Sequence, residues 1–157
     1  MGVAKMSAWR TDQRMRLAAE AEVLKTELPH FTWYDEASAT NATIRGEHTT
    51  TAGNTYRLCL HVTSNFPNSL PGLYVTSPCP LVGYGGKTIQ SYGTSHTMHV
   101  WKPDWDNYAK LCHWKEEFWS PSNTLLSVLM KGMLWLEAFE VHCKTGKSID
   151  EYSLNFR

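Results

Sequence analysis

The segment from 122 to 142, SNTLLSVLMKGMLWLEAFEVH, constrains the fold of this chain more than any other stretch. Ser122 or Asn123 is a suitable N-cap, and apolar residues then recur at helical spacing. The recurring positions are Leu125, Leu129, Met133, Leu136 and Phe139. Other apolar residues occupy the remaining faces, so the sequence predicts a largely buried helix. The basic residue and glycine of KTG at 144–146 are typical of a helix end.

The chain before this segment predicts one more helix and several short strands. Residues 10–28 form an amphipathic pattern with Leu17 and Leu24 on its apolar face, and Pro29 ends it. Strands are predicted where β-forming residues gather or alternate, at 31–34, around 42–46, at 55–62 and at 73–77. A helix, a run of strands, a long loop and a second helix indicate an α+β fold. With 157 residues, the chain fits a single domain over residues 1–157.

Composition excludes several classes of protein. The 15 basic and 15 acidic residues balance, which gives no broad positive surface for nucleic acid or for an anionic membrane. No apolar run approaches the roughly 20 residues that span a bilayer, and the basic N-terminus lacks the apolar stretch of a secretory signal. The four cysteines are scattered without a CxxC pair, as free thiols in a reducing compartment are. We therefore expect a cytoplasmic protein that binds neither nucleic acid nor membrane.

The region from Cys79 to Pro121 has little hydrophobic periodicity, and long irregular segments in compact domains tend to be functional. Cys112 lies late in this region, next to His113, and the upstream residues His96 and His99 belong to the same segment. A cysteine acts as a nucleophile only as the thiolate, which requires exposure and a positive or hydrogen-bonding surrounding. Cys112 has the best setting of the four cysteines, although a small buried hydrophobe is the plain alternative.

The same region could also form a zinc site or the active site of a Cys-His hydrolase. A zinc site would draw on the set His96, His99, Cys112 and His113. That spacing fits no closed zinc shell, so we expect no metal, and no cofactor either. A Cys-His hydrolase would take its base from the same histidines, but the sequence has no glycine-rich nucleophile elbow. The tryptophans of the region are expected to pack it against the buried helix; they are Trp101, Trp105, Trp114 and Trp119.

Taken in order, these segments resemble the ubiquitin-conjugating enzyme superfamily. TYRLCLHV at 55–62 runs into NFPNSLPGLYVTSP at 65–78, which is similar to the proline-rich turn of that family and its next strand. SHTMHVW at 95–101 stands where the family has its HPN motif, and Cys112 stands where it has the acceptor cysteine. WSPSNTLLSVLMKGMLWL at 119–136 is similar to the tryptophan-led approach to the central helix. The likeness covers about residues 10–142 and lies in order and spacing more than in identity.

The resemblance implies an antiparallel β-meander flanked by an N-terminal helix and a buried central helix. It also implies that Cys112 accepts an activated C-terminal glycine as a thioester and passes it to a lysine amine. No HPN motif is present, so the donor for the oxyanion is open. His96 or His99 stands in for the histidine of the motif, and Asn107 and His113 are substitutes for its polar function. The histidine-to-cysteine spacing is longer than in the family.

The pattern from SHTMHVW to WLEAFEVH resembles a divergent bacterial branch of the superfamily. That branch accompanies ubiquitin-like conjugation and antiviral signalling operons, including operons built around cyclic-oligonucleotide synthases. The implied partners are a ubiquitin-like modifier or the C-terminus of such a synthase, with an activating enzyme as a further partner. Two alternatives stay open: a non-catalytic module of the same fold that binds a ubiquitin-like protein, and the Cys-His hydrolase.

Overall fold

A computed structural model describes residues 8–93 and 97–152 of the chain. The helices and strands are α1 (Thr11–Glu27), β1 (Thr32–Tyr34), β2 (Thr43–Thr49), β3 (Thr55–His61), β4 (Gly72–Ser77), β5 (Val100–Trp101), β6 (Ala109–Leu111) and α2 (Leu125–Thr145). Single 3-10 turns occur at η1 (Tyr84–Gly86), η2 (Ile89–Tyr92), η3 (Glu116–Phe118) and η4 (Ile149–Tyr152). The strands form one antiparallel sheet in the order β1-β2-β3-β4-β6-β5. The predicted α+β class is therefore confirmed.

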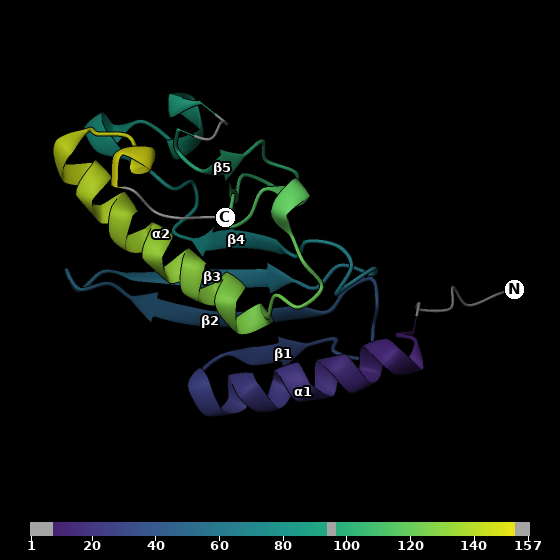
Figure 1. Ribbon diagram of the computed structural model, residues 1–157. Helices are drawn as coiled ribbons and strands as arrows, with labels where there is room; N and C mark the ends of the chain where they lie inside the picture. Colours follow the sequence, from purple (N-terminus) through teal and green to yellow (C-terminus); the bar gives the residue numbers. More distant parts are fainter. Residues whose placement is uncertain (1–7, 94–96, 153–157) are drawn as a thin grey trace, which may run out of the picture.

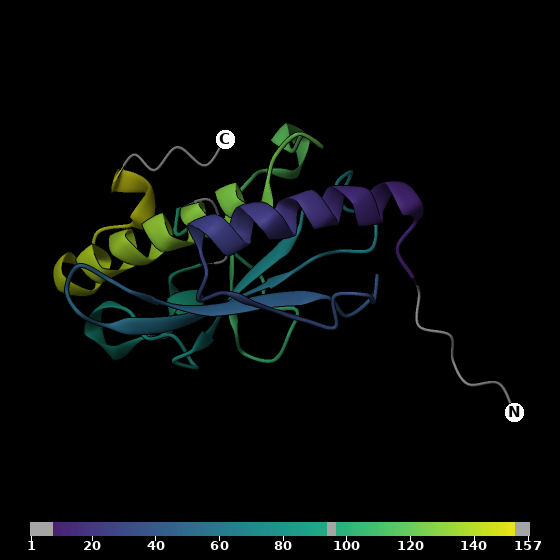
Figure 2. The ribbon, with the colours of Figure 1, turned by 90° about the horizontal axis from the view of Figure 1, so that it is seen from below.

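Both long helices lie on the same side of the sheet. Figure 1 shows α2 running diagonally across the strands, with α1 beside β1 at the sheet's edge. Seen from below in Figure 2, both helices are on one side and the strands on the other. The opposite side of the sheet carries no helix among the described residues. The core accordingly fills the space between the helices and one face of the sheet.

Close packing between α2 and the sheet depends on a glycine. A Cβ atom added at Gly132 would lie 2.7 Å from Leu73 Cδ2 on β4 and 3.6 Å from Leu58 Cδ1 on β3. Any larger residue there would push α2 away from the strands. Trp135, Leu136 and the other inward residues of α2 are fully buried, as the sequence predicted for this helix.

The start of α2 differs from the sequence prediction, and its end agrees with the prediction. The N-cap is Thr124, whose Oγ1 accepts a hydrogen bond from Ser127 N at 3.1 Å, and not Ser122 or Asn123. Ser122 lies in a turn before the helix, and the Asn123 N–H donates to the carbonyl of Ser120 at 2.9 Å, so the helix begins after both. Gly146 ends the helix in the left-handed conformation with φ 76°, as the KTG sequence predicted.

The region from 79 to 121 is less irregular than expected. It contains β5 and β6, which pair with each other, and β6 also pairs with β4. These strands have two and three residues, which is too short for an alternating pattern to be visible in the sequence. Their stability comes from pairing with β4, a contact between distant parts of the chain. Cys112 follows β6 directly and lies outside the strand.

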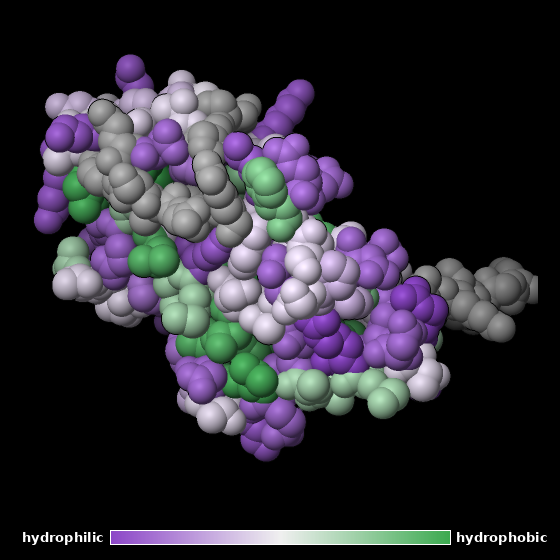
Figure 3. Space-filling view, in the orientation of Figure 1, coloured by the Kyte–Doolittle hydropathy of each residue, from purple (hydrophilic) through white to green (hydrophobic). Residues whose placement is uncertain are grey.

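Part of the α2 surface stays apolar and exposed. Figure 3 shows hydrophobic side chains gathered along this helix on the face turned to the viewer. Met130 and Leu134 are each 54% exposed, and Val141 is exposed further along.

Within residues 8–93 and 97–152, no helix combines the length and the apolar character needed to cross a bilayer.

Candidate functional site around Cys112

Cys112 sits at the point where β6 leaves the sheet. Its N–H donates to the carbonyl of His99 at 2.8 Å, which extends the β5–β6 pairing by one further bond. The side chain is 7% exposed, and its Sγ contacts the carbonyl of Trp114 at 3.9 Å. A nucleophilic thiol requires exposure, so this burial matches the plain alternative for Cys112, a small buried hydrophobe. The segment after the strand folds back over the sulfur through the buried residues His113 and Trp114.

Burial and two lysines act in opposite directions on the Cys112 thiol. Burial raises the pKa of Cys112 above its usual value of 9.0, while the charges of Lys115 and Lys131 lower it. Lys115 follows on the same loop, whereas Lys131 comes from α2. Burial lowers the pKa of Lys131 to about 8, and the nearby Cys112 thiolate works against that change. The charged forms of Cys112 and Lys131 thus attract each other in the folded protein.

Lys131 is the residue that sequence reasoning missed. Its Nζ lies 3.3 Å from the centroid of the Trp114 ring, a cation–π contact between α2 and the segment that follows Cys112. In the sequence, Lys131 is one of several charged positions on a largely apolar helix. Nothing in the linear pattern connects it with Cys112, because the connection depends on how α2 crosses the sheet.

His113 is held in a defined protonation state. The ring is 2% exposed, and Nε2 lies 2.7 Å from the carbonyl of Pro71. A carbonyl only accepts hydrogen bonds, so Nε2 carries the proton and Nδ1 is a bare acceptor, buried and without a hydrogen-bond partner. Burial lowers the pKa of His113 to about 4, which keeps the ring neutral near pH 7. Its single N–H is committed to Pro71, so an oxyanion role for His113 stays a prediction and would require that bond to break.

The other predicted polar residues lie in different surroundings. His99 is 1% exposed, and its Nε2 lies 3.0 Å from Asp150 Oδ1 in the C-terminal turn, while its carbonyl accepts from Cys112. Asn107 is exposed in the loop between β5 and β6, at the opposite end of β6 from Cys112. Its carbonyl accepts a hydrogen bond from Gln90 at 3.5 Å. His96 falls outside the described residues.

The four tryptophans divide into two groups, and only one group meets the expectation. Trp114 is buried and packs edge to face with Trp119 at 5.5 Å, and Trp119 Nε1 donates to the carbonyl of Pro67 at 2.8 Å. These two hold the segment after Cys112 in place. Trp101 and Trp105 are exposed by 38% and 37% and do not join the core. Trp105 packs against Tyr74 instead, on the side of the sheet without helices.

The ring nitrogens that would bind a metal are directed apart. His99 Nε2 bonds to Asp150 and His113 Nε2 bonds to Pro71, on different sides of the chain. Across the part of the chain that the structure describes, no three histidine, cysteine, aspartate or glutamate side chains gather closely enough to hold an ion. The absence of zinc in the protein stays a prediction.

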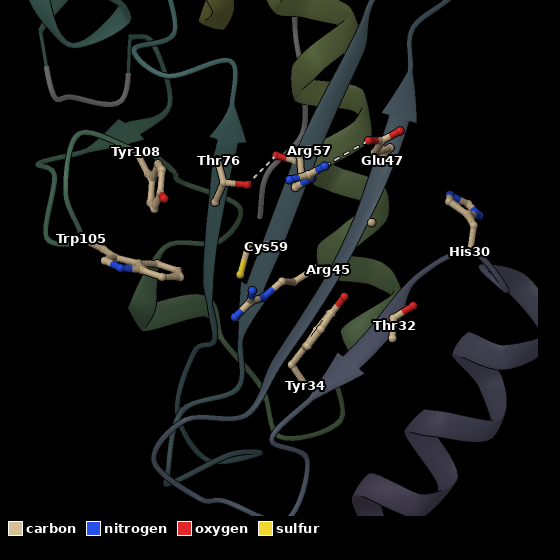
Figure 4. Close-up of a pocket in the computed structure, with 11 residues that line it drawn as sticks. His30, Thr32, Tyr34, Arg45, Glu47, Arg57, Cys59, Thr76, Trp105 and Tyr108 are labelled. Atoms are coloured by element: carbon tan, nitrogen blue, oxygen red, sulfur yellow. Dashed lines mark hydrogen bonds and ion pairs between the residues drawn. The ribbon is translucent and has the colours of Figure 1, made fainter.

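A large hollow in the described structure lies away from Cys112. It has a volume of about 600 Å³ and is bordered by Arg45, Arg57, Cys59 and aromatic residues that include Trp105. Figure 4 shows these side chains on the near side of the strands with α2 behind them, so the hollow occupies the sheet face without helices. Arg57 is already paired with Glu47 there at 3.4 Å. We place the candidate chemistry at Cys112, because Cys59 on this hollow's floor is 1% exposed and burial raises its pKa.

Comparison of the chain with models of protein families, with curated proteins and with solved structures finds no significant match. The assignment of a function therefore depends on the residues and the geometry described above.

Proposed function

We propose that the protein is a ubiquitin-like conjugating enzyme of the ubiquitin-conjugating enzyme superfamily. In this function Cys112 accepts an activated C-terminal glycine as a thioester and transfers it to a lysine amine. The observation that carries the proposal is the position of Cys112. It directly follows the last strand of an antiparallel sheet, which an N-terminal helix precedes and a buried helix follows. That order is the one the sequence resemblance implies.

The chemistry of the site is compatible with this role. A thioester keeps its carbonyl reactive because sulfur contributes little resonance stabilisation, so the carrier must supply a thiolate and a fixed location. Trp114 and Trp119 fix the backbone after Cys112, and Lys115 and Lys131 favour the ionised sulfur. The tetrahedral intermediate also needs a donor for its oxyanion, typically worth about 2.7–4 kcal/mol. That donor is an open part of the proposal.

The partners follow from the same reaction. The donor is the C-terminus of a ubiquitin-like modifier, or that of a cyclic-oligonucleotide synthase in a bacterial antiviral system, delivered by an activating enzyme. A non-catalytic binding module of the same fold is the second candidate, and the 7% exposure of Cys112 is the observation that favours it. A Cys-His hydrolase has less support, because burial lowers the pKa of His113 to about 4 and makes its ring a weak base near pH 7.

The test is a mobility shift on a non-reducing gel with the cognate activating enzyme and modifier. The wild-type protein is expected to form an adduct that thiol reagents remove. Cys112→Ala should abolish this adduct, and Cys112→Ser should form a slower adduct that resists thiol, since an oxygen ester is a poorer acyl donor. Cys79→Ala is the matched control, because this exposed cysteine lies away from Cys112 and its loss should leave the adduct unchanged. A thiol-sensitive adduct on the Cys112→Ala protein would refute the assignment.

A further inference from the structure

An arginine on the sheet face without helices is held in a defined position. Arg45 extends from β2 into the hollow of about 600 Å³, and Figure 4 shows its guanidinium directed toward the side where Trp105 lies. Its Nε donates to Thr43 Oγ1 at 3.1 Å, and its Cζ lies 4.5 Å from the centroid of the Tyr34 ring. These contacts occupy the Nε–H and one face of the guanidinium. The two terminal nitrogens keep the fork that binds a carboxylate or a phosphate.

The carboxylates around this hollow do not balance the charge of Arg45. A second hollow of about 590 Å³ adjoins the first and shares Arg45 and Trp105 with it. Two of the described carboxylates that border these hollows already form ion pairs with other residues. The pairs are Glu47 with Arg57 and Asp104 with Lys110. Asp35 borders the second hollow, but it forms no ion pair with Arg45. Arg45 is therefore a cation to which the described part of the chain supplies no anion.

Trp105 forms an aromatic wall of the same hollow. Its ring packs edge to face with Tyr74 at 5.2 Å and with Tyr108 at 5.1 Å, and 37% of the residue stays exposed. The two neighbouring rings restrict the orientation of the indole and leave part of its surface on the hollow. An indole surface of this kind stacks well with a planar aromatic ring.

We propose that this hollow binds a small molecule in which an aromatic ring carries a carboxylate or phosphate group. The oxyanion accepts hydrogen bonds from the terminal nitrogens of Arg45, and the ring packs on Trp105. The volume of about 600 Å³ lies within the range of roughly 300–1,000 Å³ that is typical of small-molecule sites. The proposal goes beyond the function proposed for Cys112 and does not depend on it.

Isothermal titration calorimetry with four probes tests the proposal. 1-Naphthyl phosphate and 1-naphthoate join the aromatic ring to the two kinds of oxyanion, whereas 1-naphthol lacks the anion and inorganic phosphate lacks the ring. At least one of the two acids is expected to bind with a Kd of about 1 mM or tighter, as the usual ligand efficiency gives for molecules of this size. The acid that binds more tightly identifies the oxyanion. 1-Naphthol and inorganic phosphate should bind at least about 10-fold more weakly than that acid.

Variants of the two proposed contact residues locate the binding. Arg45→Met removes the guanidinium at similar length and should weaken binding of the acid at least about 10-fold. Arg45→Lys keeps the charge without the fork and should give a smaller loss. Trp105→Leu should weaken binding about 5-fold. Arg14→Met and Trp101→Leu are the matched controls, because both residues are exposed and lie outside the two hollows. Thermal unfolding confirms that each variant is folded.

Three results would overturn the proposal. The first is that neither acid binds saturably to the folded wild-type protein. The second is that 1-naphthol binds as tightly as the acids, since this would mean apolar binding without the arginine. The third is that folded Arg45→Met binds like the wild type or that Arg14→Met loses as much affinity. The titrations need no modifier or activating enzyme, so their outcome is independent of whether Cys112 forms a thioester.

Discussion

His113 shows how the surroundings of one residue set its protonation state. The ring combines nearly complete burial with a hydrogen bond that a carbonyl can only accept. The neutral ring satisfies that bond, whereas a second proton on Nδ1 would place an uncompensated charge in the core. Because protonation of His113 is unfavourable in the folded protein, the free energy of unfolding should depend on pH.

We predict that His113 makes the protein less stable in acid. The folded pKa of about 4 lies below the ordinary value of 6.5, so the unfolded chain binds the proton first as the pH falls. The stabilisation is complete above about pH 6.5 and is lost between 6.5 and 4, by about 3 kcal/mol if the whole shift applies. Urea unfolding at a series of pH values measures this slope.

His113→Gln is the matched variant for that measurement. A glutamine amide can still donate to Pro71 and does not titrate, so the difference in free energy of unfolding between wild type and variant should shrink as the pH falls toward 4. Two stability curves that stay parallel from pH 7 to pH 4 would show that His113 is protonated without penalty.

Cys112 is a packed side chain, because only 7% of it is exposed. Its replacement should therefore change stability. Losing the buried sulfur should cost about 1 kcal/mol, a value close to that of one buried methylene. Cys112→Ser should cost more, about 1–3 kcal/mol, because its hydroxyl is poorly hydrogen-bonded there. Urea unfolding under reducing conditions tests the order, and Cys79→Ala, at an exposed position, should change stability by no more than about 0.5 kcal/mol.

At this scale the sequence singled out Cys112 as a candidate, but it did not predict which side chains surround it. Cys112 stood out because polar and aromatic residues cluster around it in the chain. The contact between Lys131 and Trp114, and the bond from His113 to Pro71, join segments that are far apart in sequence. Such contacts depend on the angle of α2 and on the path of the turn before β4. Neither can be predicted from the residues of one short segment.

At the scale of elements, the contact between α1 and α2 depends on a buried carboxylate. Glu20 on α1 is 5% exposed, and its Oε1 accepts a hydrogen bond from Leu125 N at 2.8 Å, at the first residue of α2. Arg16, one turn earlier on α1, lies 3.7 Å from the same oxygen. A carboxylate at a helix N-terminus satisfies a free N–H and favours the helix dipole.

We predict that Glu20→Ala lowers the free energy of unfolding by about 2 kcal/mol, within the range for a lost hydrogen bond to a charged group. Glu20→Gln should recover part of this loss, because the amide oxygen can still accept from Leu125 but has no charge. Glu22→Ala is the control, since Glu22 is exposed on the same helix and its loss should cost no more than about 0.5 kcal/mol. Equal losses for Glu20 and Glu22 in urea unfolding would contradict the capping role.

Long elements could be predicted from the sequence, and so could the short strand β1 from its β-forming residues, whereas β5 and β6 could not. The two helices and the strands at β2, β3 and β4 carry enough residues for a period to emerge. On α1 the expected polar face was wrong at Gln13 and Glu20, which are buried because each bonds to another segment of the chain. The strands β5 and β6 exist through pairing with β4, so their own residues contain little signal.

On the scale of the whole molecule, the cysteines sample four different environments. Cys59 lies on β3, paired with β2 and β4 on its two sides, and is 1% exposed. Cys112 is buried beside α2, Cys143 is partly buried, and Cys79 is exposed. In the sequence they are four scattered thiols. Their different degrees of burial follow only from the packing of the helices on one face of the sheet.

These environments predict the order in which the native thiols react with an aromatic disulfide reagent at pH 8. Cys79 should react first, since it alone among the four is exposed. Cys143 should be slower, because burial is the main cause that raises its pKa to about 11. Cys59 should be last, at least about 100-fold slower than Cys79, since it is 1% exposed at the floor of the hollow and burial raises its pKa. In strong denaturant all four should react together. A native Cys59 as fast as Cys79 would contradict the burial of this thiol beneath the side chains of the hollow.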